Sequence, residues 1–124
     1  MNKKNGFTFT ELVITLVVAG VLALIAIPAY KGYVNKGLDT EGKALLNEID
    51  SAQQIYYSRH GHYYQGTANQ QHGASFGVDT RRNKYFTSYS IVTDESGNYT
   101  AKANYKTKVL TMKGSITAEP QIIN

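Results

Sequence analysis

An unbroken apolar run dominates the first quarter of the chain. Residues 12–29 comprise 18 positions without a charged side chain. At about 1.5 Å of rise per residue, a helix of that length covers most of the hydrocarbon core of a bilayer. Residues 7–10 are uncharged as well and extend the same segment. The pattern therefore predicts a membrane-compatible helix near the N-terminus.

Beyond this run, the pattern changes to a single apolar face with a helical period. Apolar or small residues recur at steps of three, four or seven, at Leu38, Gly42, Leu45, Ile49, Ala52 and Tyr56. Polar residues occupy the other faces, at Glu41, Lys43, Asn47, Glu48 and Gln54. This spacing predicts an amphipathic helix packed on a sheet, with Gly42 allowing close approach. Gly61 is a natural C-cap.

We therefore expect one helix over residues 7–60, apolar over 7–29 and amphipathic over 30–60. Pro28 would remove one backbone hydrogen bond from this helix, and Gly20 has a poor helix propensity. Both residues are expected to give the helix flexibility, and residues 28–37 should be its weakest stretch. The alternative is a helix that ends at Pro28.

Strand patterns follow an irregular connection. Residues 61–84 interleave glycine with polar residues, as is typical of a loop. Residues 84–93, 98–105 and 109–113 are rich in aromatic, β-branched or alternating apolar residues, and turn-forming residues separate them at 94–97 and 106–107. We expect an α+β fold in which the long helix packs on a small antiparallel meander of three to four strands. Residues 85–124 would form this sheet and a C-terminal tail.

Length, charge and composition limit the number of domains, the orientation in the membrane and the classes of function that we expect. The chain has 124 residues, a formal net charge of +4 and no cysteine, so one domain without a disulfide is expected. Lys3 and Lys4 precede the apolar run and put the N-terminus in the cytoplasm by the positive-inside rule. No nucleophile–base pair, phosphate-binding loop or pair of acids in a cleft is readable. Neither an enzyme nor a cofactor is expected.

Glu11 is the one ionisable residue within residues 7–29. A carboxylate in such a segment costs about 2.5–3.5 kcal/mol on insertion scales, so it requires a partner. A cut between Gly6 and Phe7 would create an α-ammonium group one helical turn before Glu11. An ordinary secretory signal does not fit, because its apolar core is shorter and a small-x-small cleavage site follows it.

These features resemble the class III signal of type IV pilins and of the related pseudopilins of type II secretion. The similarity consists of a short leader over residues 1–6 that ends in glycine, an aromatic residue after the cut, a glutamate four positions later and a long apolar helix. Thr10 stands where an aliphatic residue is usual, and Phe9 where leucine is commoner. Neither departure touches the cut or the carboxylate.

The resemblance implies that a prepilin peptidase cleaves between Gly6 and Phe7 and that Phe7 is then N-methylated. It implies that Glu11 serves assembly by pairing with the ammonium group of a neighbouring copy. The partners would be further copies of the chain, the peptidase and methyltransferase, and the pilus assembly machinery. The chain would start as a single-pass protein of the bacterial inner membrane and end in an extracellular pilus.

We accordingly expect a structural pilus subunit that serves adhesion, motility or DNA uptake. One alternative is a pseudopilin of type II secretion, although Glu119 is the only acid in the tail and pseudopilins commonly bind calcium in that region. The other alternative is a DNA-binding minor pilin. Its candidate nucleic-acid contacts are the basic cluster of Arg81, Arg82 and Lys84, joined by Lys102, Lys106, Lys108 and Lys113 from the strands.

The remaining candidates for chemistry favour structural roles. His60, His62 and His72 lie in or beside a glycine-rich loop with no cysteine or nearby acid to complete a metal site, so no metal is expected. Tyrosines at helical spacing, at Tyr30, Tyr33, Tyr56 and Tyr57, are far more often packing residues than a path for electrons.

Overall fold

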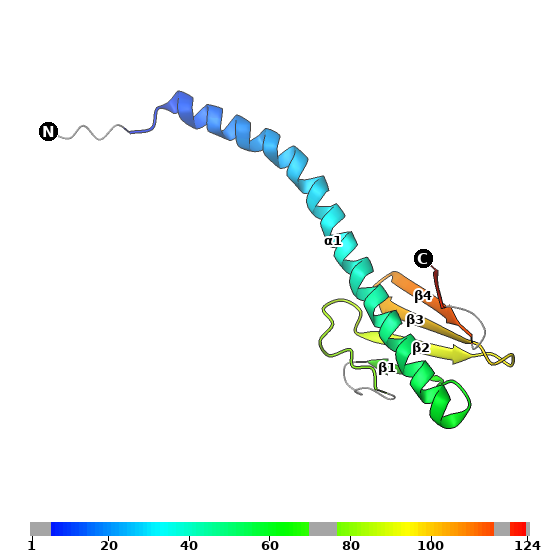
Figure 1. The fold of residues 1–124 in the computed structure, drawn as a ribbon. Coiled ribbons are helices and arrows are strands. Elements are labelled where there is room, and N and C mark those ends of the chain that lie inside the picture. Colours follow the sequence, from blue (N-terminus) through cyan, green and yellow to red (C-terminus); the bar gives the residue numbers. More distant parts are fainter. Residues whose placement is uncertain (1–5, 70–76, 116–119, 124) are drawn as a thin grey trace. The chain divides into compact units, whose positions relative to one another are not determined.

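The computed structural model describes residues 6–69, 77–115 and 120–123 (Figure 1). Its tertiary contacts divide the chain into two units, residues 1–36 and residues 37–124. One helix, α1 (Phe9–His60), begins in the first unit and ends in the second. His72 and Glu119, which entered the predictions about metal binding, lie outside the described residues.

The first unit consists of the apolar part of α1. The most apolar 18-residue window of this helix has a mean hydropathy of 2.8, and none of that window is buried in the protein. By length and composition α1 could therefore cross a membrane. The helix runs through Pro28 without a break. The alternative that it ends at Pro28 is wrong.

The second unit contains a five-stranded sheet. Its strands are β1 (Gly66–Asn69), β2 (Ser88–Thr93), β3 (Tyr99–Tyr105), β4 (Lys108–Gly114) and β5 (Gln121–Ile123). They pair in sequence order, and every pair is antiparallel. The predicted turns join them: Gly97 has a φ of 77° and closes the β2–β3 turn with a hydrogen bond of 3.2 Å to Asp94, and Lys106 has a φ of 50° between β3 and β4. The predicted α+β meander is thus confirmed.

The C-terminal half of α1 lies across one face of this sheet (Figure 1). The buried helix residues are Leu38, Gly42, Leu45, Leu46, Ile49 and Gln53, and they meet buried side chains of the strands, among them Tyr89, Ile91, Tyr99, Leu110 and Met112. A Cβ atom at Gly42 would overlap Leu110 Cδ1 and lie 2.9 Å from Phe86 Cε2, which confirms that glycine allows the close approach. Gly61 has a φ of 74° and donates its N–H to Tyr57 O, ending α1 as expected for a C-cap.

The sheet has five strands, one more than the upper limit of the three to four that were expected. β1 lies within residues 61–84, which were expected to be irregular, and β5 lies in the expected tail. Both are short edge strands, and β1 gives no apolar alternation because it reads Gly-Thr-Ala-Asn. Pairing with β2 stabilises β1, and pairing with β4 stabilises β5. Local sequence carries little information about such strands, because tertiary context decides strand formation.

The buried face of α1 is also rotated from the predicted one. Ala52 and Tyr56 are only half-buried, whereas Leu46 and Gln53 are fully buried. Gln53 is buried because its side-chain amide satisfies a peptide group of the following loop. Its Nε2 donates to Tyr64 O, and its Oε1 accepts from Tyr64 N, both at 2.8 Å. A polar residue can thus occupy the core when its hydrogen bonds are complete.

Candidate assembly site and nucleic-acid interface

Glu11 caps the N-terminus of α1 in this structure. Its Oε2 accepts hydrogen bonds from Thr8 N at 2.8 Å and from Thr8 Oγ1 at 2.7 Å, and Glu11 N donates to Thr8 Oγ1 at 3.2 Å. This reciprocal arrangement is a capping box, for which Thr8-Phe9-Thr10-Glu11 carries the sequence signature. The signature was present in the sequence but did not enter the prediction, which paired Glu11 with the new α-ammonium group, within a chain or between neighbouring helices.

Four other residues predicted to act in processing or helix flexibility are exposed, namely Gly6, Phe7, Gly20 and Pro28. Phe7 is 77% exposed and precedes the first helical turn. A Cβ atom at Gly6 or at Gly20 would meet nothing within 4 Å. Gly20 is therefore not required for close packing within the chain, in contrast to Gly42. Pro28 lies inside α1.

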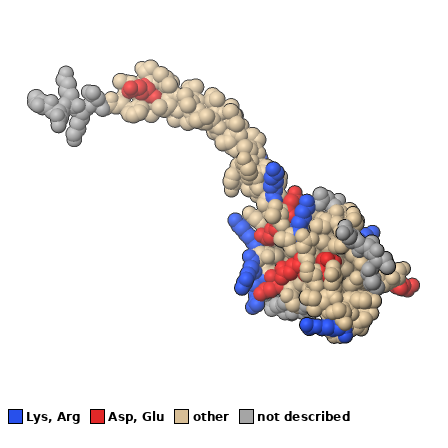
Figure 2. Space-filling model, in the orientation of Figure 1, with Lys and Arg blue, Asp and Glu red and all other residues tan. Residues whose placement is uncertain are grey.

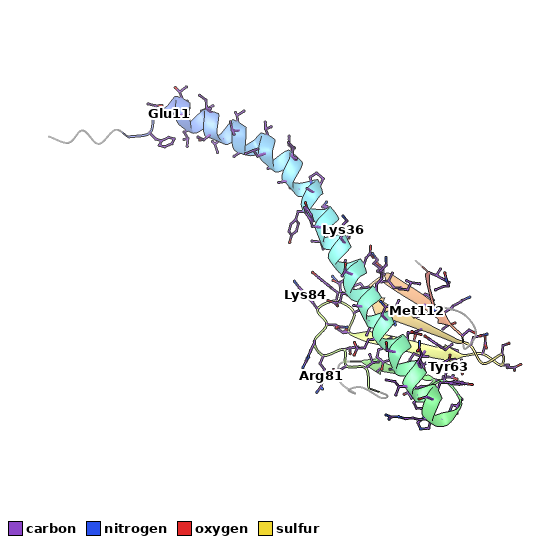
Figure 3. All side chains as sticks on the ribbon, viewed as in Figure 1. Glu11, Lys36, Tyr63, Arg81, Lys84 and Met112 are labelled. Carbon is purple, nitrogen blue, oxygen red and sulfur yellow. The ribbon has the colours of Figure 1, made fainter. Side chains whose placement is uncertain are left out.

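The predicted basic residues lie on an ordered loop that precedes β2, defined here as the basic loop, residues 79–87. Side chains bond to the backbone along its length. Arg81 N donates to Asp79 Oδ1, Thr80 Oγ1 donates to Thr87 O, and Asn83 Nδ2 donates to Phe86 O, at 2.9–3.0 Å. Figure 3 labels Arg81 and Lys84 on this loop, at the outer edge of the second unit. Arg81, Arg82 and Lys84 are all exposed on this loop.

The Arg81 side chain forms an ion pair with Asp79, two residues earlier on the same loop. The guanidinium group donates to both oxygens of Asp79, from Nε at 2.9 and 3.1 Å and from a terminal nitrogen at 2.8 Å. These hydrogen bonds, together with the one from the Arg81 backbone, lower the pKa of Asp79 to about 2. Asp79 thus offsets the charge of Arg81 at neutral pH. Sequence reasoning counted Arg81 as a full cation and missed this pair.

Glu41 anchors the same loop to α1. Its Oε1 accepts hydrogen bonds from Tyr85 N at 2.7 Å and from Phe86 N at 2.8 Å, and its Oε2 accepts one from Lys84 N at 3.1 Å. The sequence placed Glu41 on a polar face of the helix and gave no sign of this role, because the partners are more than 40 residues away. These bonds also explain why β2 begins at Ser88 and not at the predicted residue 84.

Two tyrosines and two lysines form a second part of the surface, defined here as the Lys–Tyr cluster: Lys84, Tyr85, Tyr105 and Lys106. The rings of Tyr85 and Tyr105 meet edge to face with their centroids 5.3 Å apart. Lys84 Nζ lies 5.3 Å from the Tyr85 centroid, and Lys106 Nζ lies 5.4 Å from the Tyr105 centroid. The cluster joins the basic loop to the β3–β4 turn, and its tyrosines are half-buried.

The strand lysines differ in their surroundings. Lys108 forms an ion pair with Asp39 of α1, which reduces its availability to an outside anion. Lys102 and Lys113 are exposed on β3 and β4. Figure 2 shows Lys and Arg side chains along the edge that carries Lys84 and Arg81, with acidic groups beside them. The basic surface is therefore a local strip and not a uniformly positive face.

The described histidines stack with tyrosines. His60 packs face to face on Tyr56 with centroids 4.1 Å apart, and His62 meets the same ring edge-on at 5.7 Å. The Nδ1 atom of each ring lies 3.0 Å from a backbone oxygen. Within residues 6–69, 77–115 and 120–123 no three His, Asp or Glu side chains form a group suited to a metal ion.

Two protein-family models match this chain, one at the N-terminal segment and one over most of the remaining residues. A family model described as "Prokaryotic N-terminal methylation motif" matches residues 1–27. A second, described as "Type IV minor pilin ComP, DNA uptake sequence receptor", matches residues 28–113, well over half of the chain. No solved structure matches.

Relatives of known sequence are pilins. A fimbrial protein of Neisseria meningitidis serogroup A is 29% identical over 118 residues, which cover 95% of this chain and 68% of the relative. The type IV major pilin PilE1 of Neisseria gonorrhoeae is 31% identical over 101 residues, covering 82% of this chain and 53% of the relative. The type IV major alpha-pilin of Moraxella bovis is 48% identical over 40 residues, or 32% of this chain and 25% of the relative.

The N-terminal motif, the long apolar helix, the antiparallel meander and the relatives thus agree. The chain belongs to the type IV pilins, a family of structural subunits and not of enzymes, and carries a ComP-type minor-pilin domain.

Proposed function

We propose that this chain is a minor pilin that binds DNA at the pilus surface. The observation that carries the proposal is the family match over residues 28–113, because that family is described as a DNA uptake sequence receptor. It revises the sequence-based ranking, in which a fibre-building subunit came first and DNA binding was an alternative. The comparisons lend the pseudopilin alternative no support, since the relatives named above are pilins.

The basic loop and the Lys–Tyr cluster supply the chemistry for this role. Arg82, Lys84 and Lys106 present cationic groups to solvent, and such groups bind phosphates by releasing counterions. Tyr85 and Tyr105 offer ring edges and hydroxyl groups between the ammonium groups, as in many nucleic-acid surfaces. Arg81 would contribute less than its charge suggests, because two of its guanidinium nitrogens already donate to Asp79.

The N-terminal segment serves processing and assembly in this proposal. The peptidase would cut between Gly6 and Phe7 and the new terminus would be methylated, consistent with the match to the methylation motif. Glu11 would then leave its capping bonds or share them with the ammonium group of a neighbouring subunit. The chain would pass from the inner membrane into an extracellular pilus, with Gly20 and Pro28 letting α1 adapt on the way.

Processing can be tested directly on the protein isolated from cells. Mass spectrometry should show loss of residues 1–6 and one added methyl group on Phe7. The variant Gly6→Leu should remain at full length, because the peptidase requires a small residue before the cut. A mature-sized product from this variant would contradict the assigned cut.

DNA binding is best measured by fluorescence anisotropy with the full-length chain in a non-ionic detergent. We expect the logarithm of the affinity for a 30-base-pair duplex to fall linearly with the logarithm of salt concentration. The double variant Arg82→Gln/Lys84→Gln should reduce that slope by about 2, since each lost phosphate contact removes about 0.9. Arg59→Gln is the matched control. It removes the same kind of charge about 27 Å along α1 from Glu41 and should leave the slope nearly unchanged.

Sequence preference is tested with two duplexes of equal composition, one from the genome of the source organism and one shuffled. A receptor for an uptake sequence should prefer a genomic fragment that carries the sequence, by base contacts worth about 1–3 kcal/mol each. Equal affinity for every genomic fragment and its shuffled partner would limit the function to non-specific binding. No salt-dependent binding at all would overturn the proposed function.

A further inference from the structure

The carboxylate of Glu41 has an unusual place for an acid on a surface that would bind DNA. It lies beside Lys84, in the middle of the basic loop's attachment to α1, and it is half-buried. A negative charge here lowers the attraction of the surface for a polyanion. If Glu41 favours DNA binding despite its charge, it must do so through the hydrogen bonds of its carboxylate.

Those contacts fix three consecutive peptide groups. The N–H groups of Lys84, Tyr85 and Phe86 all point at the Glu41 carboxylate. β2 begins only at Ser88, so no strand pairing satisfies these donors. Hydrogen bonds to a charged acceptor are stronger than those between neutral groups. The three together hold the backbone from which the Lys84 and Tyr85 side chains leave.

Close packing beside Glu41 limits movement of the same segment. Gly42 brings α1 against Phe86 and Leu110, and Phe86 is completely buried. With the Phe86 side chain fixed in the core and the backbone amides fixed on Glu41, Tyr85 is directed toward Tyr105 at the β3–β4 turn. The arrangement of the Lys–Tyr cluster thus depends on a residue that is not part of it.

We infer that Glu41 is a positioning residue for nucleic-acid binding, which presents the Lys–Tyr cluster to the phosphate backbone of DNA without touching it. This inference rests on the proposed function. Both oxygens of Glu41 already accept bonds from the protein's own backbone, so the residue acts through the loop. The positioning effect of Glu41 should strengthen DNA binding, whereas its negative charge alone would weaken it.

The sign difference gives a sharp experiment. Glu41→Ala removes one negative charge, so a purely electrostatic role predicts tighter binding to DNA, whereas a positioning role predicts weaker binding. We expect the Kd of full-length Glu41→Ala for the same duplex to rise about three- to tenfold and its salt slope to fall by about 1, as for the loss of one phosphate contact. Glu41→Gln should lie between the wild type and Glu41→Ala, because its single oxygen can still accept from Tyr85 N and Phe86 N.

Glu48→Ala is the matched control. Glu48 is exposed on the same helix seven residues later, and its removal changes the net charge equally. We expect it to leave the Kd unchanged or to lower it. Hydrogen exchange supplies a second readout: the amides of residues 84–86 should lose protection in Glu41→Ala, while those of β3 keep it.

Each outcome decides the matter. Unchanged or tighter DNA binding by Glu41→Ala, with the wild type binding normally, overturns the inference and leaves the proposed function intact. Absence of DNA binding by the wild type overturns both. If Glu41→Ala fails to fold, as judged by circular dichroism, Glu41→Gln decides: weaker binding supports positioning, and binding equal to or tighter than wild type refutes it.

Discussion

Leu24 and Leu46 belong to the same helix, but Leu24 is 75% exposed and Leu46 is completely buried. The same contrast holds across the two units: the apolar side chains of residues 9–33 are exposed, whereas most of those in the second unit form a core between α1 and the sheet. Apolar residues that the chain itself does not cover need another partner. We propose that a membrane before assembly and the helices of neighbouring subunits in the fibre are these partners.

Two glycines of α1 repeat the contrast. A Cβ atom at Gly20 would meet nothing, while one at Gly42 would overlap Leu110. We therefore expect the first unit to respond to substitution through contacts with other molecules, and the second through contacts within the chain. Substitutions at matched positions can separate these two kinds of dependence.

The largest effect is expected at Glu11. Glu11→Ala should reduce incorporation of this chain into the pilus to a background level, because an uncompensated ammonium group in an apolar helix bundle is strongly unfavourable. Membrane insertion and the fold of the second unit should persist. Immunoblots of sheared surface fibres and of membrane fractions measure both. Wild-type amounts of fibre containing this variant would reject the assembly role of Glu11.

Matched leucines test the contrast in stability. Leu46→Ala should lower the free energy of unfolding by about 2–5 kcal/mol, since it leaves a cavity between α1 and the sheet. Leu24→Ala should change it by less than about 0.5 kcal/mol, because the side chain is 75% exposed and its loss leaves no cavity in the core. Urea unfolding followed by near-ultraviolet circular dichroism measures the difference. Equal effects at both positions would mean that the first unit is covered by the chain after all.

A smaller loss is expected at the polar residue of the core. Gln53→Leu leaves the N–H and C=O groups of Tyr64 without their side-chain partner, which should cost about 1–3 kcal/mol. Its neighbour Gln54 is exposed and donates one surface hydrogen bond, to Asp50 Oδ2. Gln54→Leu is therefore the control for losing a solvent-accessible bond, with an expected change below about 0.5 kcal/mol. The same urea titration applies. A neutral Gln53→Leu would show that these bonds contribute nothing net.

The smallest expected effect is a loss of folding stability at alkaline pH. Burial raises the pKa of Tyr89 from 10.0 to about 12. Burial and the hydrogen bond that Tyr99 donates to the Asp50 carboxylate raise the pKa of Tyr99 as well. The folded chain thus holds these protons more tightly than the unfolded chain. Stability should be full below about pH 10 and fall as the pH rises above it.

Two phenylalanine variants check this pH dependence. Tyr99→Phe should flatten the fall in stability above pH 10, because one of the linked protons is then missing. Tyr30→Phe changes an exposed tyrosine of the first unit and should leave the profile unchanged. Unfolding free energies measured between pH 8 and pH 11.5 decide the matter, and a Tyr99→Phe profile identical to that of the wild type would contradict the linkage.

Much of this architecture could be read from local patterns. The uncharged run, the helical period from Leu38 to Ile49, the C-cap at Gly61 and the turn before Gly97 are each encoded within a few residues, so helix and sheet were foreseeable. The position of Glu11 in an apolar segment likewise pointed to the pilin signal. Such features depend on propensity and periodicity, which act between near neighbours in the chain.

Long-range contacts account for what could not be foreseen. β1 and β5 exist because β2 and β4 offer them unpaired edges, and Gln53 is buried because the loop after α1 returns a peptide group to it. Glu41 reads as a solvated helix residue until the fold brings Lys84, Tyr85 and Phe86 against it. In each case a hydrogen-bonding group is satisfied by a partner far away in sequence. Strand pairing and the packing of loops against α1 create that proximity, and no local pattern records it.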